Sequence, residues 1–389
     1  MSKIPHVAED ILAGHPDRIA DAVAERTVDH AVALDEDALV CVEVAVFRRT
    51  VAITGRIAAG KPEQASELFR ESVVRDTFRA AGYHGRWAVL DSRFRGPVKH
   101  GELDPDDDTS PVVFCQLDPG PLSDEERAIR KFSDDQNIVV GHASGSAKTN
   151  WLPPAQFAVR RLRERLQALR HANPDVLGPD GKVLIRFIED GDSYQWDFCN
   201  VALQHAEGVG FEALHRLVLP ALEAEGNALD EALPGLGASW SAECVRLNGI
   251  GDFSCGGPHG DNGLSGKKLV VDHYGPSVPI GGGALCGKDP HKVDRVGALR
   301  ARQLAVRLVR DAGAKSATVR LGYVPGLEAP AFVEADVDGE QWDEPCIRKA
   351  VAIPDLAIAQ AFRDLELGEV RWETVIRQGY FGSGRAWER

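Results

Sequence analysis

Runs of β-branched and apolar residues alternate along the chain with stretches that carry helical signals, and this alternation restricts the fold more than any other feature. The predicted strands are 38–46, 50–57, 182–189, 194–206, 267–275, 317–324 and 331–337. The predicted helices are 62–82, which starts with a proline and ends with a glycine, 211–226, which contains a proline, and 296–313. A strand pair, a helix and another strand pair recur about three times, which predicts three similar α/β units.

Length, charge and cysteine content exclude several classes of protein. At 389 residues the chain is too long for one core, so two or three domains are expected. The net charge of −14 argues against a nucleic acid or an anionic membrane as partner. No apolar run approaches the ~18 residues of a membrane span, and the N-terminus lacks the pattern of a signal peptide. Seven cysteines without a C-x-x-C pair predict neither a zinc site nor a disulfide framework, and we expect a cytoplasmic location.

Residues 93–128 are rich in Asp, Pro and Gly and include the acidic run "ELDPDDDTSP". This composition predicts a long loop. Loops of this length are either functional lids or solvated, disordered segments, and composition does not decide between the two.

Two glycine-rich stretches, "GGPHGDNGLSGKKLVVD" (256–272) and "GGGALCGKDPHKVDR" (281–295), are the strongest signals of a binding site. The second nearly matches the phosphate loop G-x-x-x-x-G-K-[ST], through Gly282, Gly287 and Lys288. The position of the required hydroxyl holds Asp289, and no strongly apolar strand runs directly into the segment. A phosphate loop of that type is therefore not expected, although exposed backbone N–H groups and lysines still favour a polyphosphate.

Lysines and aspartates alternate within these two stretches: Lys267, Lys268, Lys288 and Lys292 with Asp261, Asp289 and Asp294. Carboxylates among phosphate-binding lysines would repel the ligand unless a divalent cation bridges them. The alternative is an ordinary glycine-rich turn with solvated charges. Near the N-terminus, "GHPDRIAD" places His15 and Asp17 at the start of a predicted helix. Asp17 by itself would be interpreted as a helix cap, but together the pair also suits a phosphate ester with Mg²⁺.

Five motifs together resemble those of the S-adenosylmethionine synthetases (methionine adenosyltransferases). They are "GHPDRIAD", "DDQNIVVGHA", "GPDGK" and the two glycine-rich stretches, which occur in the family's order and with similar spacing from about residue 7 to 326. The tail from 327 to 389 matches only loosely. The resemblance implies a fold of three pseudo-repeated α/β domains, each a mixed sheet with helices on one face. We divide the chain into ranges 1–118, 119–250 and 251–389.

The resemblance implies a reaction in which methionine sulfur attacks C5′ of ATP and expels the triphosphate, which is cleaved to pyrophosphate and phosphate before release. Catalytic roles are implied for His15, Lys182, Lys288 and Lys292. ATP contacts are implied for His15, Asp180, Lys182, Phe253, Asp261, Lys267, Lys268, Ala284 and Lys288. Substrate contacts are implied for Arg56, Gln116, Asp135, Asp261 and Lys292. Asp17 and Asp294 would hold Mg²⁺, of which two ions are expected, and Glu43 would hold K⁺. The implied assembly is a homodimer or a dimer of dimers with the site at the interface.

Several residues depart from the family's pattern. Asp134 and Asn137 replace glycines that usually flank the Asp-Gln pair, and Asp252 precedes Phe253 where an arginine is usual. Arg56 occupies the place of a glutamate that contacts the ammonium group of methionine. A permanent positive charge there would repel an ammonium group.

Three functions therefore remain open. The first is an adenosyltransferase for methionine or another thioether, the second a weakened homologue that binds ATP and regulates a partner, and the third an NTPase that releases ADP.

Overall fold

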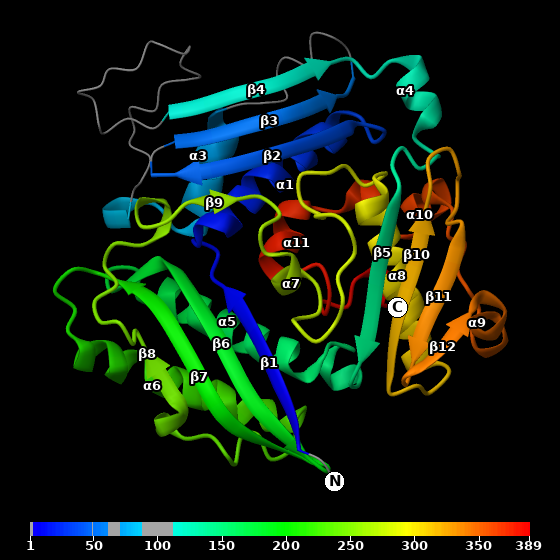
Figure 1. Ribbon diagram of the computed structural model, residues 1–389. Coiled ribbons are helices and arrows are strands. Elements are labelled where there is room, and N and C mark those ends of the chain that lie inside the picture. The colour runs from blue at the N-terminus through cyan, green and yellow to red at the C-terminus, as the bar shows by residue number, and fades with distance from the viewer. Residues whose placement is uncertain (1–2, 49, 61–70, 88–111) are drawn as a thin grey trace.

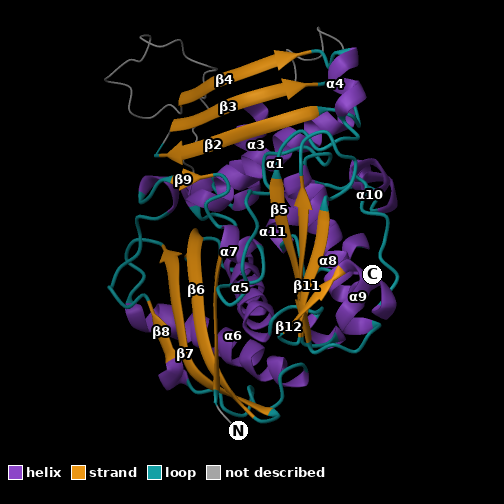
Figure 2. Ribbon diagram, turned by 45° about the vertical axis from the view of Figure 1, so that its right-hand side comes forward, coloured by secondary structure: helices purple, strands orange, loops and turns teal. Residues whose placement is uncertain are grey.

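A computed structural model describes residues 3–48, 50–60, 71–87 and 112–389, and shows an α/β architecture. Within these residues three four-stranded sheets surround a central group of helices that includes α1 and α11 (Figure 1). Seen from a second direction, a group of helices again lies between the sheets, and other helices lie at the edges of the molecule (Figure 2). The predicted fold of three α/β units is confirmed. In the described part of the chain, no helix is long and apolar enough to cross a membrane.

The first sheet has the order β4-β3-β2-β9 and is formed by β2 (Leu39–Phe47), β3 (Thr50–Ala58), β4 (Val112–Gly120) and β9 (Gly263–Leu264). Valines alternate along β2, so that Val40, Val42 and Val44 are buried while Cys41 and Glu43 are exposed. The buried face packs on α1 (Pro16–Leu34). The opposite face is therefore free to carry polar side chains.

The second sheet has the order β1-β6-β7-β8 and is dominated by two long strands, which fits the predicted strands 182–189 and 194–206. Its members are β1 (Ile4–Ile11), β6 (Leu177–Asp190), β7 (Ser193–His205) and β8 (Val245–Leu247). Helices α5 (Pro154–Ala172) and α6 (Phe211–Ala228) cover one face, and α6 contains the expected proline. Both this sheet and the first contain parallel as well as antiparallel pairs.

The third sheet, β12-β11-β10-β5, pairs antiparallel throughout, so mixed pairing holds for two of the three sheets. It is formed by β5 (Asn137–Ser144), β10 (Ser316–Tyr323), β11 (Phe332–Val337) and β12 (Glu340–Asp343). The long helix α8 (Val293–Arg310) packs directly on β5, where a Cβ at Gly141 would lie 2.0 Å from the carbonyl carbon of Ala301. The remaining longer helices are α3 (Glu71–Ala81), α9 (Glu344–Ala350), α10 (Ile358–Asp364) and α11 (Trp372–Gln378).

The sheets exchange strands between distant parts of the chain. The strand β1 joins β6, β9 joins β2, and β5 joins β10. Each sheet thus takes a strand from outside one contiguous stretch of sequence. The division into 1–118, 119–250 and 251–389 stays a sequence-based prediction. The exchange brings the glycine-rich segments against the N-terminal residues.

Two expectations about secondary structure were wrong. The run 267–275 is not a strand, because Leu269–Asp272 forms the short helix α7, with the Asp272 N–H donating to the Lys268 carbonyl (2.8 Å). A short apolar run does not distinguish a buried helical turn from a strand. The predicted loop 93–128 contains β4 and the helix α4 (Asp124–Ile129), which starts with a capping box at Ser123. Its first part, up to residue 111, lies outside the described residues, as does the start of the helix predicted at 62–82.

Candidate active site

The N-terminus of α1 is capped by His15, whose Nδ1 accepts a hydrogen bond from the Asp17 N–H (3.1 Å). The histidine is 1 % exposed. Since Nδ1 is an acceptor, the ring hydrogen of the neutral form is on Nε2. The interpretation of Asp17 as the cap is therefore wrong, because the preceding histidine takes that role.

Burial and neighbouring lysines hold His15 in its neutral form. Loss of solvation and the positive charge of Lys182 lower its pKa to about 3; the carboxylate of Asp17 opposes this, and Lys268 and Arg18 add to it. A neutral imidazole with a hydrogen on Nε2 can donate a hydrogen bond to an anionic oxygen without adding a charge of its own. Lys182 itself is exposed on β6, opposite Ile11 of β1.

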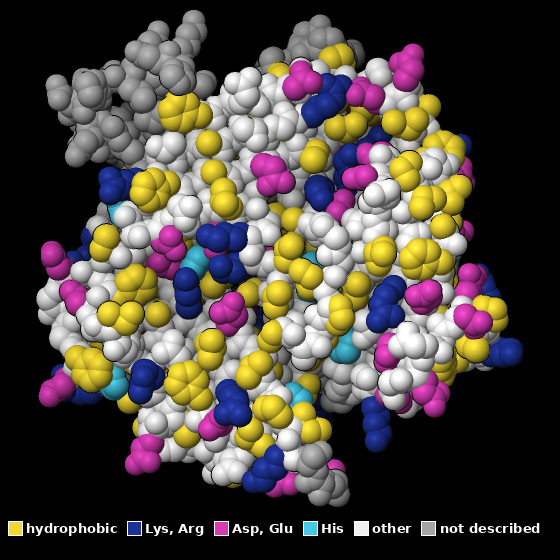
Figure 3. Space-filling view, viewed as in Figure 1, with side chains coloured by type: hydrophobic (Ala, Val, Ile, Leu, Met, Phe, Trp, Pro, Cys, Tyr) yellow, Lys and Arg dark blue, Asp and Glu magenta, His cyan; other side chains and the backbone are white. Residues whose placement is uncertain are grey.

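Asp17 joins α1 to the first glycine-rich segment. It is fully buried, accepts the Leu264 N–H (3.0 Å), and lies 2.8 Å from the Nζ of Lys268 and 3.6 Å from that of Lys267. Burial alone would raise the pKa of Asp17, but the hydrogen bonds from Lys268 and Leu264 outweigh it and hold the pKa below the usual value. The two lysines and the aspartate predicted here are thus brought together. In Figure 3, basic, acidic and histidine side chains gather on this face, near β9.

The second glycine-rich segment forms a similar group at the start of α8. The Nζ of Lys288 lies 2.9 Å from Asp294, which also accepts a hydrogen bond from the Asn137 side chain (2.7 Å). A Cβ at Gly283 would lie 1.6 Å from the Asp294 carboxylate, so only glycine fits beside this pair. Lys292 forms an ion pair with Asp134. The two groups come together where Ala284 lies beside Gly266. A Cβ added at Gly266 would lie 2.7 Å from the alanine methyl.

Glu43 lies on the exposed face of β2, where it accepts a hydrogen bond from the Ser265 hydroxyl (3.0 Å). Thr54 and then Gln116 stand opposite it in the same row across the sheet. Two strand spacings, about 10 Å, therefore separate Glu43 from Gln116. The predicted glutamine is on the face of the sheet that carries Glu43, but it makes no contact with the lysine groups in the described residues.

Asp180 is a buried carboxylate with one oxygen left free. Its Oδ2 accepts the Gly257 N–H (2.8 Å), while Oδ1 finds no hydrogen-bond partner among the described residues. Burial raises the pKa of Asp180 to about 6. A buried polar atom without a partner costs free energy unless a ligand or water satisfies it. Phe253 lies, like Gly257, on the segment between β8 and β9. It is half-buried and donates its N–H to His205 (3.1 Å).

Two further predicted residues are exposed and make only local hydrogen bonds. Asp261 accepts the N–H of the next residue, Asn262, and Asp135 accepts that of Gln136, each at 2.8 Å. Neither contacts the lysine groups in the described residues, so their assignment to the site stays a prediction.

Arg56 is fixed by two acidic side chains, one from the neighbouring strand β4 and one from α4. It lies 2.7 Å from Asp118 on β4 and pairs with Glu126 on α4. Asp118 is 74 % exposed, so one of its oxygens remains open to solvent. The three charges sum to −1, from one guanidinium and two carboxylates. The positive charge of Arg56 is therefore more than neutralised by its neighbours.

The carboxylates fit metal ions only in combination with a ligand. In the described ranges, no three His, Cys, Asp or Glu side chains are grouped so that they could hold a metal by themselves. Mg²⁺ is usually bound by one or two carboxylates together with substrate phosphates and water. Asp17 and Asp294, each beside a lysine, suit a metal that arrives with a polyphosphate. Glu43 and the Ser265 hydroxyl offer oxygen ligands for a monovalent cation.

Sequence reasoning missed a second row of charges behind the lysines. Arg18 lies 2.7 Å from Asp272 and 3.2 Å from Asp21, and Asp21 accepts the Gly266 N–H (2.8 Å). Burial raises the pKa of Asp21 to about 7, against the charge of Arg18. The spacing Asp17–Asp21 could have revealed this row, since residues four apart lie on the same face of a helix.

Comparisons with known proteins agree with the motif pattern. Residues 3–95 match the family described as "S-adenosylmethionine synthetase, N-terminal domain", and residues 255–389 match its "C-terminal domain". The S-adenosylmethionine synthase of Brachyspira hyodysenteriae is 30% identical, over 96% of this chain and 92% of the relative. That of Maridesulfovibrio salexigens is also 30% identical, over 98% and 94%. The solved "Unusual S-adenosylmethionine synthetase from Campylobacter jejuni" has a TM-score of 0.79 and 27% identity, and the match covers 99% of this chain and 96% of that one.

Proposed function

The chain belongs to the S-adenosylmethionine synthetase family and is a methionine adenosyltransferase, and we propose that it forms S-adenosylmethionine from ATP and methionine at the site around His15. The sulfur of methionine attacks C5′ of ATP. A sulfur–carbon bond forms, the C5′–oxygen bond breaks, and the triphosphate leaves with the electron pair. Hydrolysis of the triphosphate to pyrophosphate and phosphate follows.

The buried, neutral His15 is the observation that best supports this reaction. Its Nε2 hydrogen is available because Nδ1 accepts the Asp17 N–H. We assign Nε2 to the bridging oxygen that becomes the leaving oxygen. A preorganised donor at an oxygen that gains charge stabilises the transition state more than the ground state. The low pKa of His15 keeps this donor neutral across the working pH range.

The lysines supply the charge that a triphosphate needs. We assign Lys182, Lys267, Lys268, Lys288 and Lys292 to its oxygens, with Lys292 also close to the substrate. In the structure, Lys268 pairs with Asp17, and Lys288 pairs with Asp294. A lysine that binds phosphate therefore leaves its aspartate without a cation. Members of this family generally use Mg²⁺ and K⁺, and we propose Asp17 and Asp294 for two Mg²⁺ ions and Glu43 for K⁺; bound Mg²⁺ would neutralise charge on the phosphates and polarise the leaving oxygen.

The nucleoside end is assigned to Asp180, Phe253, Asp261 and the Ala284 segment. The free Oδ1 of Asp180 supports this, because a hydroxyl of the ribose is a donor that would satisfy it. Phe253 offers an aromatic surface to the adenine. Asp135, Asp261 and Gln116 are exposed, which suits side chains that meet substrate and a second subunit at once. We propose a homodimer or a dimer of dimers on this basis.

The amino-acid end is the part that sequence reasoning left most open. An unpaired Arg56 would favour a thioether without an amine or with an added acid group. Its pairing with Asp118 and Glu126 leaves a net charge of −1 at this edge, which is the sign that an ammonium group needs. We therefore propose methionine as the substrate, with Asp118 as the carboxylate that meets its ammonium group.

Product analysis tests the function directly. The purified protein is incubated with ATP, MgCl₂ and KCl, with and without methionine, and the products are separated and identified by mass. S-adenosylmethionine with pyrophosphate and phosphate, formed only with methionine, is the expected result. ATP binding without turnover would instead support a regulatory homologue, and release of ADP would support an NTPase.

A further inference from the structure

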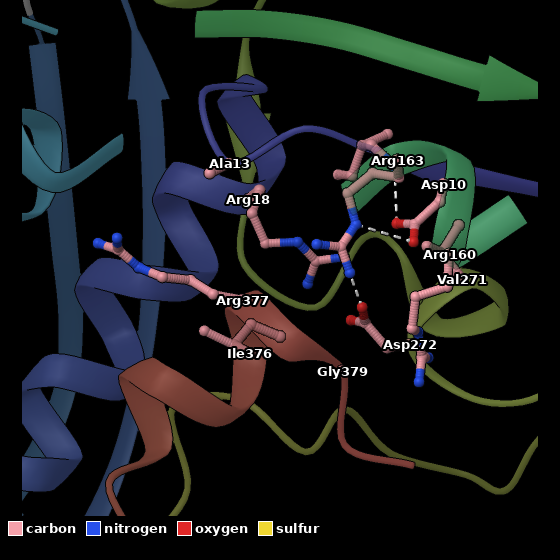
Figure 4. Close-up of a pocket in the computed structure, with 11 residues that line it drawn as sticks. Asp10, Ala13, Arg18, Arg160, Arg163, Val271, Asp272, Ile376, Arg377 and Gly379 are labelled. Atoms are coloured by element: carbon pink, nitrogen blue, oxygen red, sulfur yellow. Dashed lines mark hydrogen bonds and ion pairs between the residues drawn. The ribbon is translucent and has the colours of Figure 1, made fainter. Parts of the chain in front are cut away.

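A small cavity lies behind the lysine groups, beside Arg18 of α1. It has a volume of about 20 Å³ and is lined by β1, α1, α5, α7 and the end of α11 (Figure 4). This is room for a single particle of about the size of a water molecule. The charged lining residues are Asp10, Arg18, Arg160, Arg163, Asp272 and Arg377.

Most of these charges have partners of opposite sign. Arg18 pairs with Asp272 (2.7 Å), and Arg163 with Asp10 (3.2 Å). In Figure 4, Arg18 and Arg163 reach toward these two carboxylates, while Arg377 points away from them. Arg377 pairs with Glu373 outside the cavity. Asp21, which also contacts Arg18, lies behind it and is not part of the lining.

Arg160 is the exception. It is 7 % exposed, and no carboxylate of the described residues lies within ion-pair distance of it. Its guanidinium donates to the Phe381 carbonyl, and its Nε finds no partner in the described residues. Burial lowers the pKa of Arg160, because the charged form is poorly compensated. Buried charges are normally paired. Arg18 and Arg163 each have a second carboxylate at ion-pair distance, Asp21 (3.2 Å) and Glu164 (3.6 Å). In the described residues, Arg160 is therefore the buried guanidinium group of this lining that lacks a carboxylate partner.

We infer that this cavity binds one monatomic anion of the size of chloride, held by Arg160 with Arg163 and Arg18 beside it. The volume excludes phosphate and sulfate, which need room for five heavy atoms. A water molecule is the competing occupant, because it would fill the same space without giving Arg160 a partner of opposite charge.

The anion would support the site that faces the substrate. Arg18 bonds Asp272 on α7, and the Asp272 N–H donates to the carbonyl of Lys268. Arg18 also follows Asp17 directly on α1. An anion held by Arg160 beside Arg18 would therefore stabilise the contact between the elements that hold Lys268 and Asp17 in place.

Bromide replaces chloride in such sites and scatters X-rays anomalously, so crystals grown or soaked in NaBr give a direct test. An anomalous peak within hydrogen-bond distance of Arg160 is the expected result. Ordered water without an anomalous peak there, at bromide concentrations that label other sites, would overturn the inference. This measurement needs no catalysis, so its failure is distinct from a failure of the proposed function.

Thermal unfolding gives a second test in solution. The melting temperature of the wild type is measured in chloride and in gluconate at equal ionic strength. It should be about 2 °C higher in chloride, because an anion that binds only the folded state stabilises that state. Arg160→Met should lose this difference. Arg161→Met is the matched control on the same helix, since Arg161 is 42% exposed and pairs with Glu225; it should keep the difference. An equal chloride response in wild type and Arg160→Met would contradict the inference, and if that variant does not fold, the bromide result decides.

Discussion

The lysine groups around α1 and the Arg56 edge of the first sheet are held in different ways. Asp17 is fully buried and is fixed by a backbone N–H from another segment, and Gly283 leaves no room for any side chain beside Asp294. Arg56 and Asp118, by contrast, are 39% and 74% exposed, and Arg56 is held by ion pairs with Asp118 and Glu126. One region is set by backbone and burial, the other by side-chain ion pairs at the surface.

The sequence departs from its family in both regions, and the cost of a change differs between them. A change at a buried, backbone-anchored position leaves a polar group unsatisfied, which is costly. An exposed ion pair contributes little to stability and can be exchanged for another. The departures Arg56, Asp134 and Asn137 each have a partner: Asp118 and Glu126, Lys292, and Asp294. In the proposed assignment, Asp134 and Asn137 lie among the lysines and aspartates of the triphosphate end, while Arg56 lies at the amino-acid end, where the net charge is −1.

The largest effect is expected at the nucleotide end. Lys288→Ala should lower kcat by roughly 10²–10³-fold, and change ATP affinity less, because the lysine acts mainly on charge that develops in the transition state. Steady-state kinetics and ATP binding measure the two effects. Lys315→Ala, at an exposed position outside the site, is the control and should be unchanged. Near-normal turnover of Lys288→Ala would remove Lys288 from the mechanism.

His15→Asn separates capping from catalysis. Asparagine is a good helix cap, so the melting temperature should change little, while kcat falls by about 10²-fold with loss of the Nε2 donor. Because the pKa of His15 is about 3, the wild-type pH–rate profile should show no loss of activity near pH 6.5 from this residue. Folding disfavours protonated His15, so its effect is to lower stability as the pH falls below 6.5. A kinetic pKa between 6 and 7 that disappears in His15→Asn would contradict the assignment.

A moderate effect is expected at the amino-acid end. Asp118→Asn leaves Arg56 paired with Glu126 alone, so the net charge of this edge rises from −1 to zero. The KM for methionine should then rise by about 10-fold, while the KM for ATP stays within 2-fold. Asp124→Asn, a neighbouring exposed acid at the start of α4, is the matched control. An unchanged methionine KM in Asp118→Asn would show that this carboxylate does not meet the substrate.

The smallest effect is expected at the ion pair between Asp134 and Lys292. Asp134 pairs with Lys292, so a phosphate must displace it before it can bind that lysine. Asp134→Gly should lower the KM for ATP by about 2–5-fold, in line with the modest strength of an accessible ion pair. Initial rates at varied ATP measure this change. A raised KM would mean that Asp134 helps ATP to bind instead of competing with it.

Much of the fold was predictable because its strands and helices have strong local patterns. The valines of β2 and the apolar residues that recur among the arginines of α8 indicated the right elements. The errors came from segments defined by distant contacts. The residues of α7 form a helical turn between two loops. The segment β4 is a strand because it pairs with β3, which lies far from it in the sequence. No local pattern reveals such pairing.

The candidate site was predictable in composition but not in its pairing. The motifs identified Asp17, Lys268, Lys288 and Asp294, and the structure groups them as two lysine–aspartate pairs. Spacing along the sequence could not show that Asp118 and Glu126 neutralise Arg56, because these residues are 62 and 70 positions away from it. The hypothesis of a different thioether substrate considers Arg56 without these two neighbours, and it stays a prediction that specificity measurements decide.

The substrate specificity of the wild-type protein decides whether the Arg56 edge accepts the ammonium group of methionine. We measure kcat/KM for methionine, for its deaminated thioether and for an acid-bearing thioether, in the wild type and in Arg56→Glu. The sulfonium products are identified by mass, and kcat/KM for methionine is divided by that for each analogue. We expect a preference for methionine of about 10-fold or more in the wild type that persists in Arg56→Glu, because both proteins present a negative edge to the ammonium group. A wild-type preference for either analogue that reverses or shrinks in Arg56→Glu would contradict it.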